Sequence, residues 1–98
     1  MNIVDPSTNI LQSMNLGLTT YNIVQEAKIV EDKLYNIKQD FPVIRNLDVN
    51  MLYNKLKNDL HSYIDTKSEY LYNGLKSFLF YIRDNVIRPI EYLYGQKY

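Results

Sequence analysis

Apolar residues recur every eleven positions through the C-terminal half of the chain. One row consists of Val49, Leu60, Leu71, Ile82 and Leu93, and a second consists of Tyr53, Ile64, Leu75 and Val86. Eleven residues complete about three α-helical turns, so both rows stay on one side of a helix. The pattern predicts a long amphipathic helix over residues 48–88, which Asp48 can cap.

A second apolar pattern, with alternating steps of four and three, runs from Ile23 to Phe41 and predicts a helix over residues 20–40. It comprises Ile23, Ala27, Val30, Leu34, Ile37 and Phe41. This is a heptad seam of the coiled-coil type, typical of a helix that packs against another helix. Asn22 with Gln25 resembles a capping box at its start. Pro42 ends the helix because the residue before a proline is pushed out of the helical region.

The N-terminal residues predict a further short helix, over residues 6–16. Asp5 and Pro6 form a favourable helix start. The apolar stripe of this segment consists of Ile10, Leu11, Met14, Leu18 and Tyr21. On a helical wheel this stripe lies about 180° from the seam of helix 20–40. We therefore expect a break or sharp bend between the two helices.

One signal competes with the long C-terminal helix. Thr66, Lys67, Ser68 and Glu69 fit the pattern S/T-x-x-E, which starts a new helix. The eleven-residue spacing of the apolar residues continues through this point without a shift. For this reason we expect one continuous helix. Pro89 either kinks its last turns or opens a short new turn that Gly95 ends. The alternative is a chain that breaks near residue 66 and closes into a four-helix bundle.

The sequence therefore predicts an all-α fold with a single helical domain over residues 1–98. Its centre is an antiparallel hairpin of helix 20–40 and helix 48–88, because the connection between them is short. The second helix is the longer one, so we expect its stripe to be uncovered after about residue 70. We interpret the uncovered part as a protein interface. The predicted interface residues are Tyr70, Leu71, Leu75, Phe78, Leu79, Phe80, Ile82, Val86, Ile90 and Leu93.

The charge balance argues against a general nucleic-acid binder. Eleven basic and eleven acidic side chains give a formal net charge of zero. Basic residues do alternate with tyrosines after residue 66, but acidic residues are interleaved with them. The aromatic segment 70–94 also fits a helix lying on a membrane surface. The sequence contains no run of about twenty uncharged apolar residues, so we predict no transmembrane segment.

No motif in the chain indicates catalysis. His61 is the single histidine, and the chain has no cysteine, so metal ligands are scarce. The three glycines are isolated and form no phosphate-binding loop. We expect no enzyme activity, no cofactor and no metal site. The expected function is a structural or assembly subunit that associates with itself or packs into a larger complex, such as a virion or a membrane-associated machine. The alternatives are a small nucleic-acid-associated protein and a peripheral membrane protein.

Overall fold

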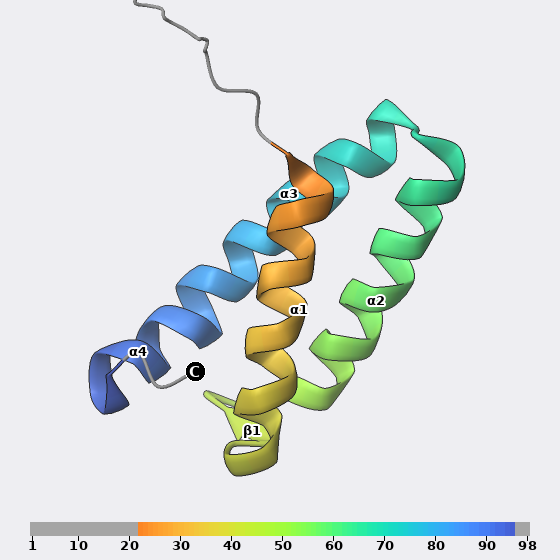
Figure 1. Ribbon diagram of the computed structural model, residues 1–98. Coiled ribbons are helices and arrows are strands. Elements are labelled where there is room, and N and C mark those ends of the chain that lie inside the picture. Colours follow the sequence, from red (N-terminus) through yellow and green to blue (C-terminus); the bar gives the residue numbers. More distant parts are fainter. Residues whose placement is uncertain (1–21, 96–98) are drawn as a thin grey trace, which may run out of the picture.

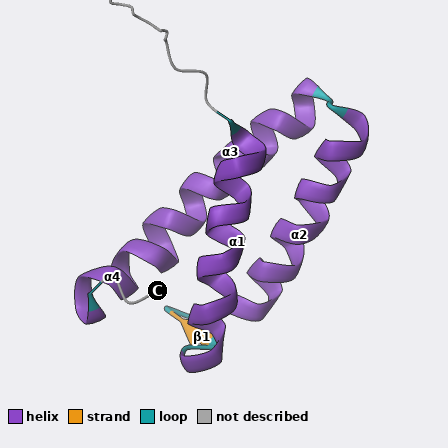
Figure 2. Ribbon diagram, viewed as in Figure 1, coloured by secondary structure: helices purple, strands orange, loops and turns teal. Residues whose placement is uncertain are grey.

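Figure 1 shows the computed structural model of the protein, which describes residues 22–95. Helices make up nearly all of this part of the chain (Figure 2). Along the chain lie α1 (Ile23–Asp40), β1 (Val43–Ile44), β2 (Leu47–Asp48), α2 (Val49–Thr66), α3 (Glu69–Ile82), the π-helical turn η2 (Arg83–Ile87) and α4 (Arg88–Tyr94). The predicted all-α class is confirmed. The predicted helix over residues 6–16 lies outside the described residues.

In the view of Figure 1 the helices run down, up and down again. α1 and α2 lie antiparallel, and α3, η2 and α4 together return along α1 in its own direction (Figure 1). Two ion pairs show this parallel arrangement, because later residues of α1 pair with later residues of the C-terminal helices. Glu26 pairs with Arg83, and Lys33 Nζ lies 2.8 Å from Glu91 Oε2. The described chain measures 44 × 34 × 17 Å, so it is a flat body about two helices thick.

Each long helix begins at a polar residue whose side chain caps it. The Asn22 side chain accepts a hydrogen bond from the Gln25 N–H at 3.1 Å, and Asp48 accepts one from the Met51 N–H at 3.0 Å. Such caps satisfy backbone donors that have no partner inside the helix. The predicted starts of the helices near residues 22 and 48 are therefore confirmed.

The predicted continuous helix over residues 48–88 is wrong. Lys67 adopts a left-handed conformation, with φ 53° and ψ 29°, and ends α2. Its N–H donates to the Tyr63 carbonyl at 2.7 Å, and Ser68 then caps α3 by accepting from the Leu71 N–H at 3.4 Å. A left-handed residue after a helix reverses the chain direction. The break near residue 66, which the sequence offered as the alternative, is the one that the structure contains.

The connection between α1 and α2 is a small β-hairpin that the sequence did not predict. Val43 pairs with Asp48 and Ile44 pairs with Leu47. The two residues of its turn, Arg45 and Asn46, have φ of 51° and 66°. Positive φ at both positions is typical of the type I′ turn, whose twist suits two paired strands.

The core lies where α1 packs against both other helices. α1 contributes the predicted heptad seam, and Leu34 and Ile37 on it are fully buried. Buried residues on the C-terminal helices are Leu75, Leu79, Ile82, Val86, Ile87 and Ile90. The expectation that helix 20–40 leaves the stripe uncovered after residue 70 is therefore wrong. The turn at Lys67 folds α3 back against α1, so α1 covers the apolar sides of both α2 and α3.

The π-helical turn shifts the register of the last helix. The Arg88 N–H donates to the Arg83 carbonyl, five residues back, so this turn holds one residue more than an α-helical turn. As a result Val86 and Ile87, although adjacent in sequence, are both buried. The extra residue also rotates α4 about its axis. Leu93 therefore does not face the core with the other residues of its row, and 66% of its surface is exposed.

Candidate protein interface

The ten predicted interface residues divide into three groups. Half of them belong to the core of this chain and are closed to a partner in this fold: Leu75, Leu79, Ile82, Val86 and Ile90. For these five the interface prediction is corrected, because the turn between α2 and α3 folds them against α1. Leu71 and Phe78 are half-buried, while Tyr70, Phe80 and Leu93 are exposed. The exposure of the last three leaves them accessible to a partner.

The half-buried ring of Phe78 already has neighbours within the chain. Lys55 Nζ lies 4.5 Å from its ring centroid, and the Tyr81 ring is stacked at 6.5 Å. A cation over a ring face and a stacked ring are both favourable contacts, and the first of them joins α2 to α3. Phe78 therefore holds the helix pair together more than it offers a free surface.

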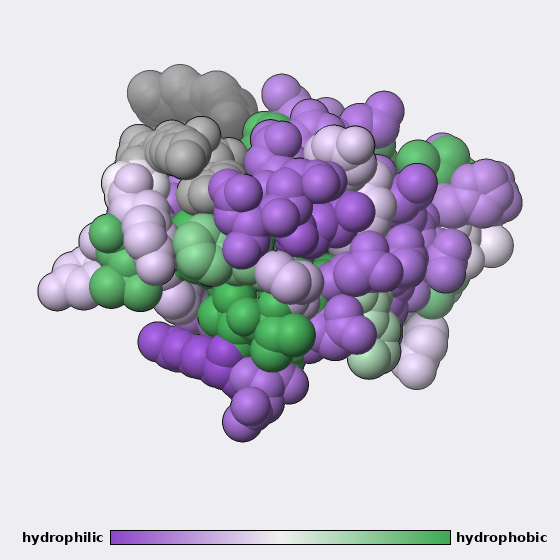
Figure 3. Space-filling model, turned by 90° about the horizontal axis from the view of Figure 1, so that it is seen from below, coloured by the Kyte–Doolittle hydropathy of each residue, from purple (hydrophilic) through white to green (hydrophobic). Residues whose placement is uncertain are grey.

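Exposed apolar side chains gather where the β-hairpin and the end of α4 meet. Tyr92, Leu93, Tyr94 and Val43 expose 88%, 66%, 54% and 62% of their surfaces, and we call these four residues the end surface. The Phe41 and Tyr94 rings, with centroids 4.9 Å apart, join the chain before the hairpin to α4. Figure 3 looks onto this end of the molecule, where separate hydrophobic patches lie among polar residues.

Sequence reasoning identified Leu93 but missed the other three members of the end surface. A usable signal was present, since three consecutive large apolar residues at 92–94 cannot all face one side of a helix. Val43 carried no such signal, because its exposure depends on the strand of the hairpin in which it lies.

The charged side chains of η2 and α4 near the end surface form ion pairs within the chain. Glu91 pairs with Lys33 at 2.8 Å, and Arg88 Nη1 lies 3.2 Å from Asp84 Oδ1. Arg83, which the sequence places with Arg88 among the basic residues near tyrosines, pairs with Glu26. Because these carboxylates offset the arginines, the arrangement does not favour phosphate binding.

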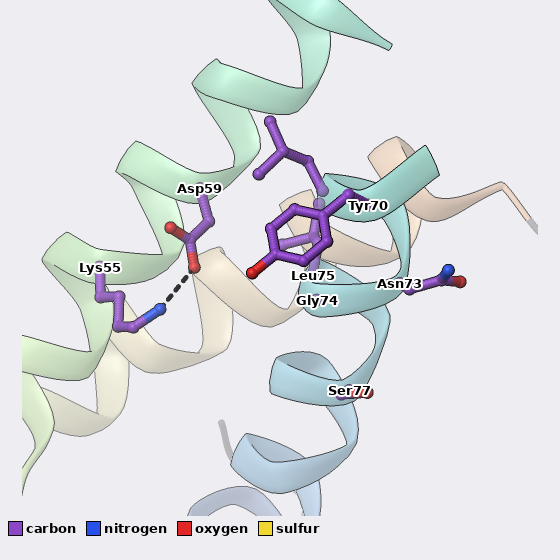
Figure 4. Close-up of a pocket in the computed structure, with 8 residues that line it drawn as sticks. Lys55, Asp59, Tyr70, Asn73, Gly74, Leu75 and Ser77 are labelled. Carbon is purple, nitrogen blue, oxygen red and sulfur yellow. Dashed lines mark hydrogen bonds and ion pairs between the residues drawn. The ribbon is translucent and has the colours of Figure 1, made fainter. Parts of the chain in front are cut away.

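A groove of about 410 Å³ lies between α2 and α3 (Figure 4). Lys55 Nζ and Asp59 Oδ2 form an ion pair of 2.8 Å on its α2 side, and the exposed ring of Tyr70 leans across from α3. The remaining lining residues are Leu71, Asn73, Gly74, Leu75 and Ser77. Among these lining residues there is no nucleophile held by a general base.

The single histidine lies on the outer surface of α2. His61 Nε2 is 3.3 Å from Asp65 Oδ2, one helical turn away, and both side chains are exposed. Exposed pairs of this kind contribute little to stability. His61 also lines a hollow of about 330 Å³, together with Glu31, Lys57, Asn58, Leu60 and Ile64, and none of these residues is a nucleophile. Among residues 22–95, no three His, Asp or Glu side chains come together as a metal site would need.

Comparison with family models, curated proteins and solved structures gives no match for this chain. None of the helices in the described part is long and apolar enough to cross a membrane.

Proposed function

We propose that this protein is a non-enzymatic helical assembly subunit, which associates with its own copies or packs into a larger complex through the end surface. The observation that carries the proposal is the exposure of Tyr92, Leu93, Tyr94 and Val43 at one end of the molecule. Large apolar side chains exposed near one another on a small protein commonly mark a place where another protein binds.

The size of the end surface supports an association of modest strength. Aromatic side chains cover about 150–250 Å² each, so the four partly exposed side chains present roughly 500 Å² per copy. Stable interfaces bury about 800 Å² per partner, and smaller ones belong to weak or transient complexes. The zero net charge of the chain adds no repulsion between copies.

The solution mass as a function of concentration tests the self-associating form of this proposal. We expect the mass to rise above the 11.7 kDa of one chain as the concentration increases from micromolar towards millimolar. Leu93→Lys should shift the association to higher concentration, because it places a charge in the end surface. The fold should survive, since 66% of Leu93 is exposed.

Tyr70→Lys provides the matched control. Tyr70 is 84% exposed and lies in the first turn of α3, away from the end surface, and the substitution introduces the same charge. It should leave the concentration dependence unchanged. A monomeric mass at every concentration, or an equal effect of both substitutions, would overturn the assignment of self-association to the end surface.

A further inference from the structure

Two tyrosines and two lysines form a cluster on the surface where α1 and α2 lie side by side (Figure 1). Tyr35 and Lys38 are three residues apart on α1, so they share one side of that helix. Tyr53 and Lys57 are four residues apart on α2 and share a side in the same way. The Tyr35 and Tyr53 rings meet across the two helices, with centroids 5.9 Å apart and planes inclined by 52°. We call these four residues the tyrosine–lysine cluster.

Both lysines of the cluster lie over tyrosine rings. Lys38 Nζ is 5.0 Å from the centroid of the Tyr35 ring and 5.4 Å from that of the Tyr53 ring. Lys57 Nζ is also 5.4 Å from the centroid of the Tyr53 ring. The two ammonium groups are therefore at most about 11 Å apart, which is twice the distance of 5.4 Å from either group to that centroid. Two positive charges thus share one aromatic ring.

Neither lysine of the cluster has a carboxylate within ion-pair distance in the described part of the chain. Glu31 lines the same hollow as Lys57 but does not pair with it. Lys55, which also lies over a ring, is different, because Asp59 pairs with it at 2.8 Å. Although the net charge of the chain is zero, the cluster therefore holds two positive charges that no paired carboxylate offsets.

We propose that the tyrosine–lysine cluster binds a single-stranded nucleic acid, with a base stacked on Tyr35 and neighbouring phosphates held by Lys38 and Lys57. Aromatic rings beside cations are the combination by which proteins hold single strands without reading their sequence. Tyr35 exposes 50% of its surface, so a base can reach its ring. An ammonium group over an exposed ring makes a weak contact. A stacked base replaces this contact with a stronger one and frees the lysine for a phosphate.

The lysines favour phosphate over the carboxylates of a partner protein. Arginine is preferred where a carboxylate is held by two parallel hydrogen bonds, whereas lysine binds phosphate as a point charge. The flexible four-carbon stems of Lys38 and Lys57 allow both ammonium groups to reach phosphates of one strand. The bases of a duplex are stacked on each other, so their faces are closed to Tyr35. The cluster therefore fits a single strand better than a duplex or an acidic peptide.

Fluorescence anisotropy of a labelled oligothymidylate of about ten nucleotides tests the proposal, since a site of this kind covers roughly 4–16 nucleotides. We expect the full chain to bind it at low salt with a Kd of about 10–100 µM. The logarithm of the affinity should fall with the logarithm of the salt concentration with a slope of about −1.4, because each of two phosphate contacts contributes roughly 0.7. Lys38→Gln combined with Lys57→Gln should remove this slope. The matched control is Lys28→Gln with Lys67→Gln, which removes the same charge from exposed lysines outside the cluster and should leave the slope unchanged.

Substitutions of Tyr35 test the stacking separately from the charge. Tyr35→Leu should weaken binding about tenfold without changing the salt slope, whereas Tyr35→Phe keeps the ring and should retain the affinity. The proposal is overturned by no binding at low salt, by equal effects of the two lysine pairs, or by equally tight binding of a duplex. Equally tight binding of polyglutamate would also overturn it and would assign the cluster to an acidic protein segment. None of these substitutions lies in the end surface, so the outcome is independent of self-association there.

Discussion

Lys67 offers the sharpest test of the fold, because the effect of replacing it with glycine has opposite signs in a broken and in a continuous helix. In the structure described here Lys67 has φ 53°, which lies in the left-handed region. That conformation costs a residue with a Cβ atom roughly 1–2 kcal/mol relative to glycine. Glycine also makes the unfolded chain more flexible, which offsets roughly 0.5–1 kcal/mol of the gain. We therefore expect Lys67→Gly to stabilise the protein by about 0.5–1 kcal/mol.

A helix that continued from residue 48 to 88 would respond in the opposite way. Lys67 would then occupy a helix interior, where exchanging lysine for glycine costs roughly 0.7 kcal/mol. Lys28→Gly supplies this reference value in the same protein, since Lys28 is exposed inside α1. The two substitutions remove and introduce the same atoms, so their difference reports the backbone conformation alone.

Thermal and urea denaturation followed by circular dichroism at the helical band measures both variants. A gain of about 0.5–1 kcal/mol corresponds to a rise in Tm of roughly 2–8 °C for a domain of this size. Lys28→Gly should lower Tm by a similar amount. If Lys67→Gly lowers the stability as much as Lys28→Gly does, the turn between α2 and α3 is refuted.

Two further predictions concern the core and the ion pairs. Leu34→Ala should reduce the free energy of unfolding by about 2–5 kcal/mol in urea titrations, because Leu34 is fully buried at the centre of α1; a loss below about 1 kcal/mol would contradict its central position. A double-mutant cycle of Glu26→Gln and Arg83→Met should give a coupling of about 0.2–1 kcal/mol that falls with added salt, since both side chains are partly exposed. A coupling that salt does not change would contradict a partly exposed pair.

The features that local sequence specifies were predictable. Asn22 and Asp48 each precede a helix and accept a hydrogen bond from its first turn, which is chemistry that the residue types alone indicate. The third cap was predicted two residues too early, because the pattern S/T-x-x-E placed it at Thr66 and the structure has it at Ser68. The heptad seam of α1 was also predicted, because one helix packed on two others buries a regular stripe. These elements depend on residues within one or two turns of each other.

The features that depend on tertiary packing were not predictable. The β-hairpin has strands of two residues, too short to show an alternating pattern. Its turn has Arg45 where asparagine or glycine is usual, so the turn signal was weak as well. The π-helical turn accommodates an extra residue near Pro89, and it becomes visible only where Val86 and Ile87 are buried together.

The predicted interface contained residues of two kinds that sequence cannot separate. Leu79 and Leu93 are both leucines on the apolar stripe of one segment, yet Leu79 is fully buried and Leu93 is exposed. The difference arises from what lies opposite: α1 covers Leu79, whereas η2 rotates Leu93 away from it. Apolarity identifies residues that need a partner, but the position of the covering helix decides whether the partner belongs to the same chain.

The eleven-residue repeat shows why an unbroken phase is weak evidence for an unbroken helix. Leu60 on α2 and Ile82 on α3 keep the eleven-residue step across a reversal of chain direction. α2 and α3 both turn their apolar sides towards α1, and each starts from its own cap. The positions of the apolar residues on each helix are therefore set by packing against α1. The turn contains two residues, Lys67 and Ser68, and this length happens to preserve the eleven-residue spacing from one helix to the next. The capping pattern at residues 66–69 was the better guide to the break, although the cap is Ser68 and not Thr66, because a cap marks a helix start locally, whereas a stripe specifies only which side is buried.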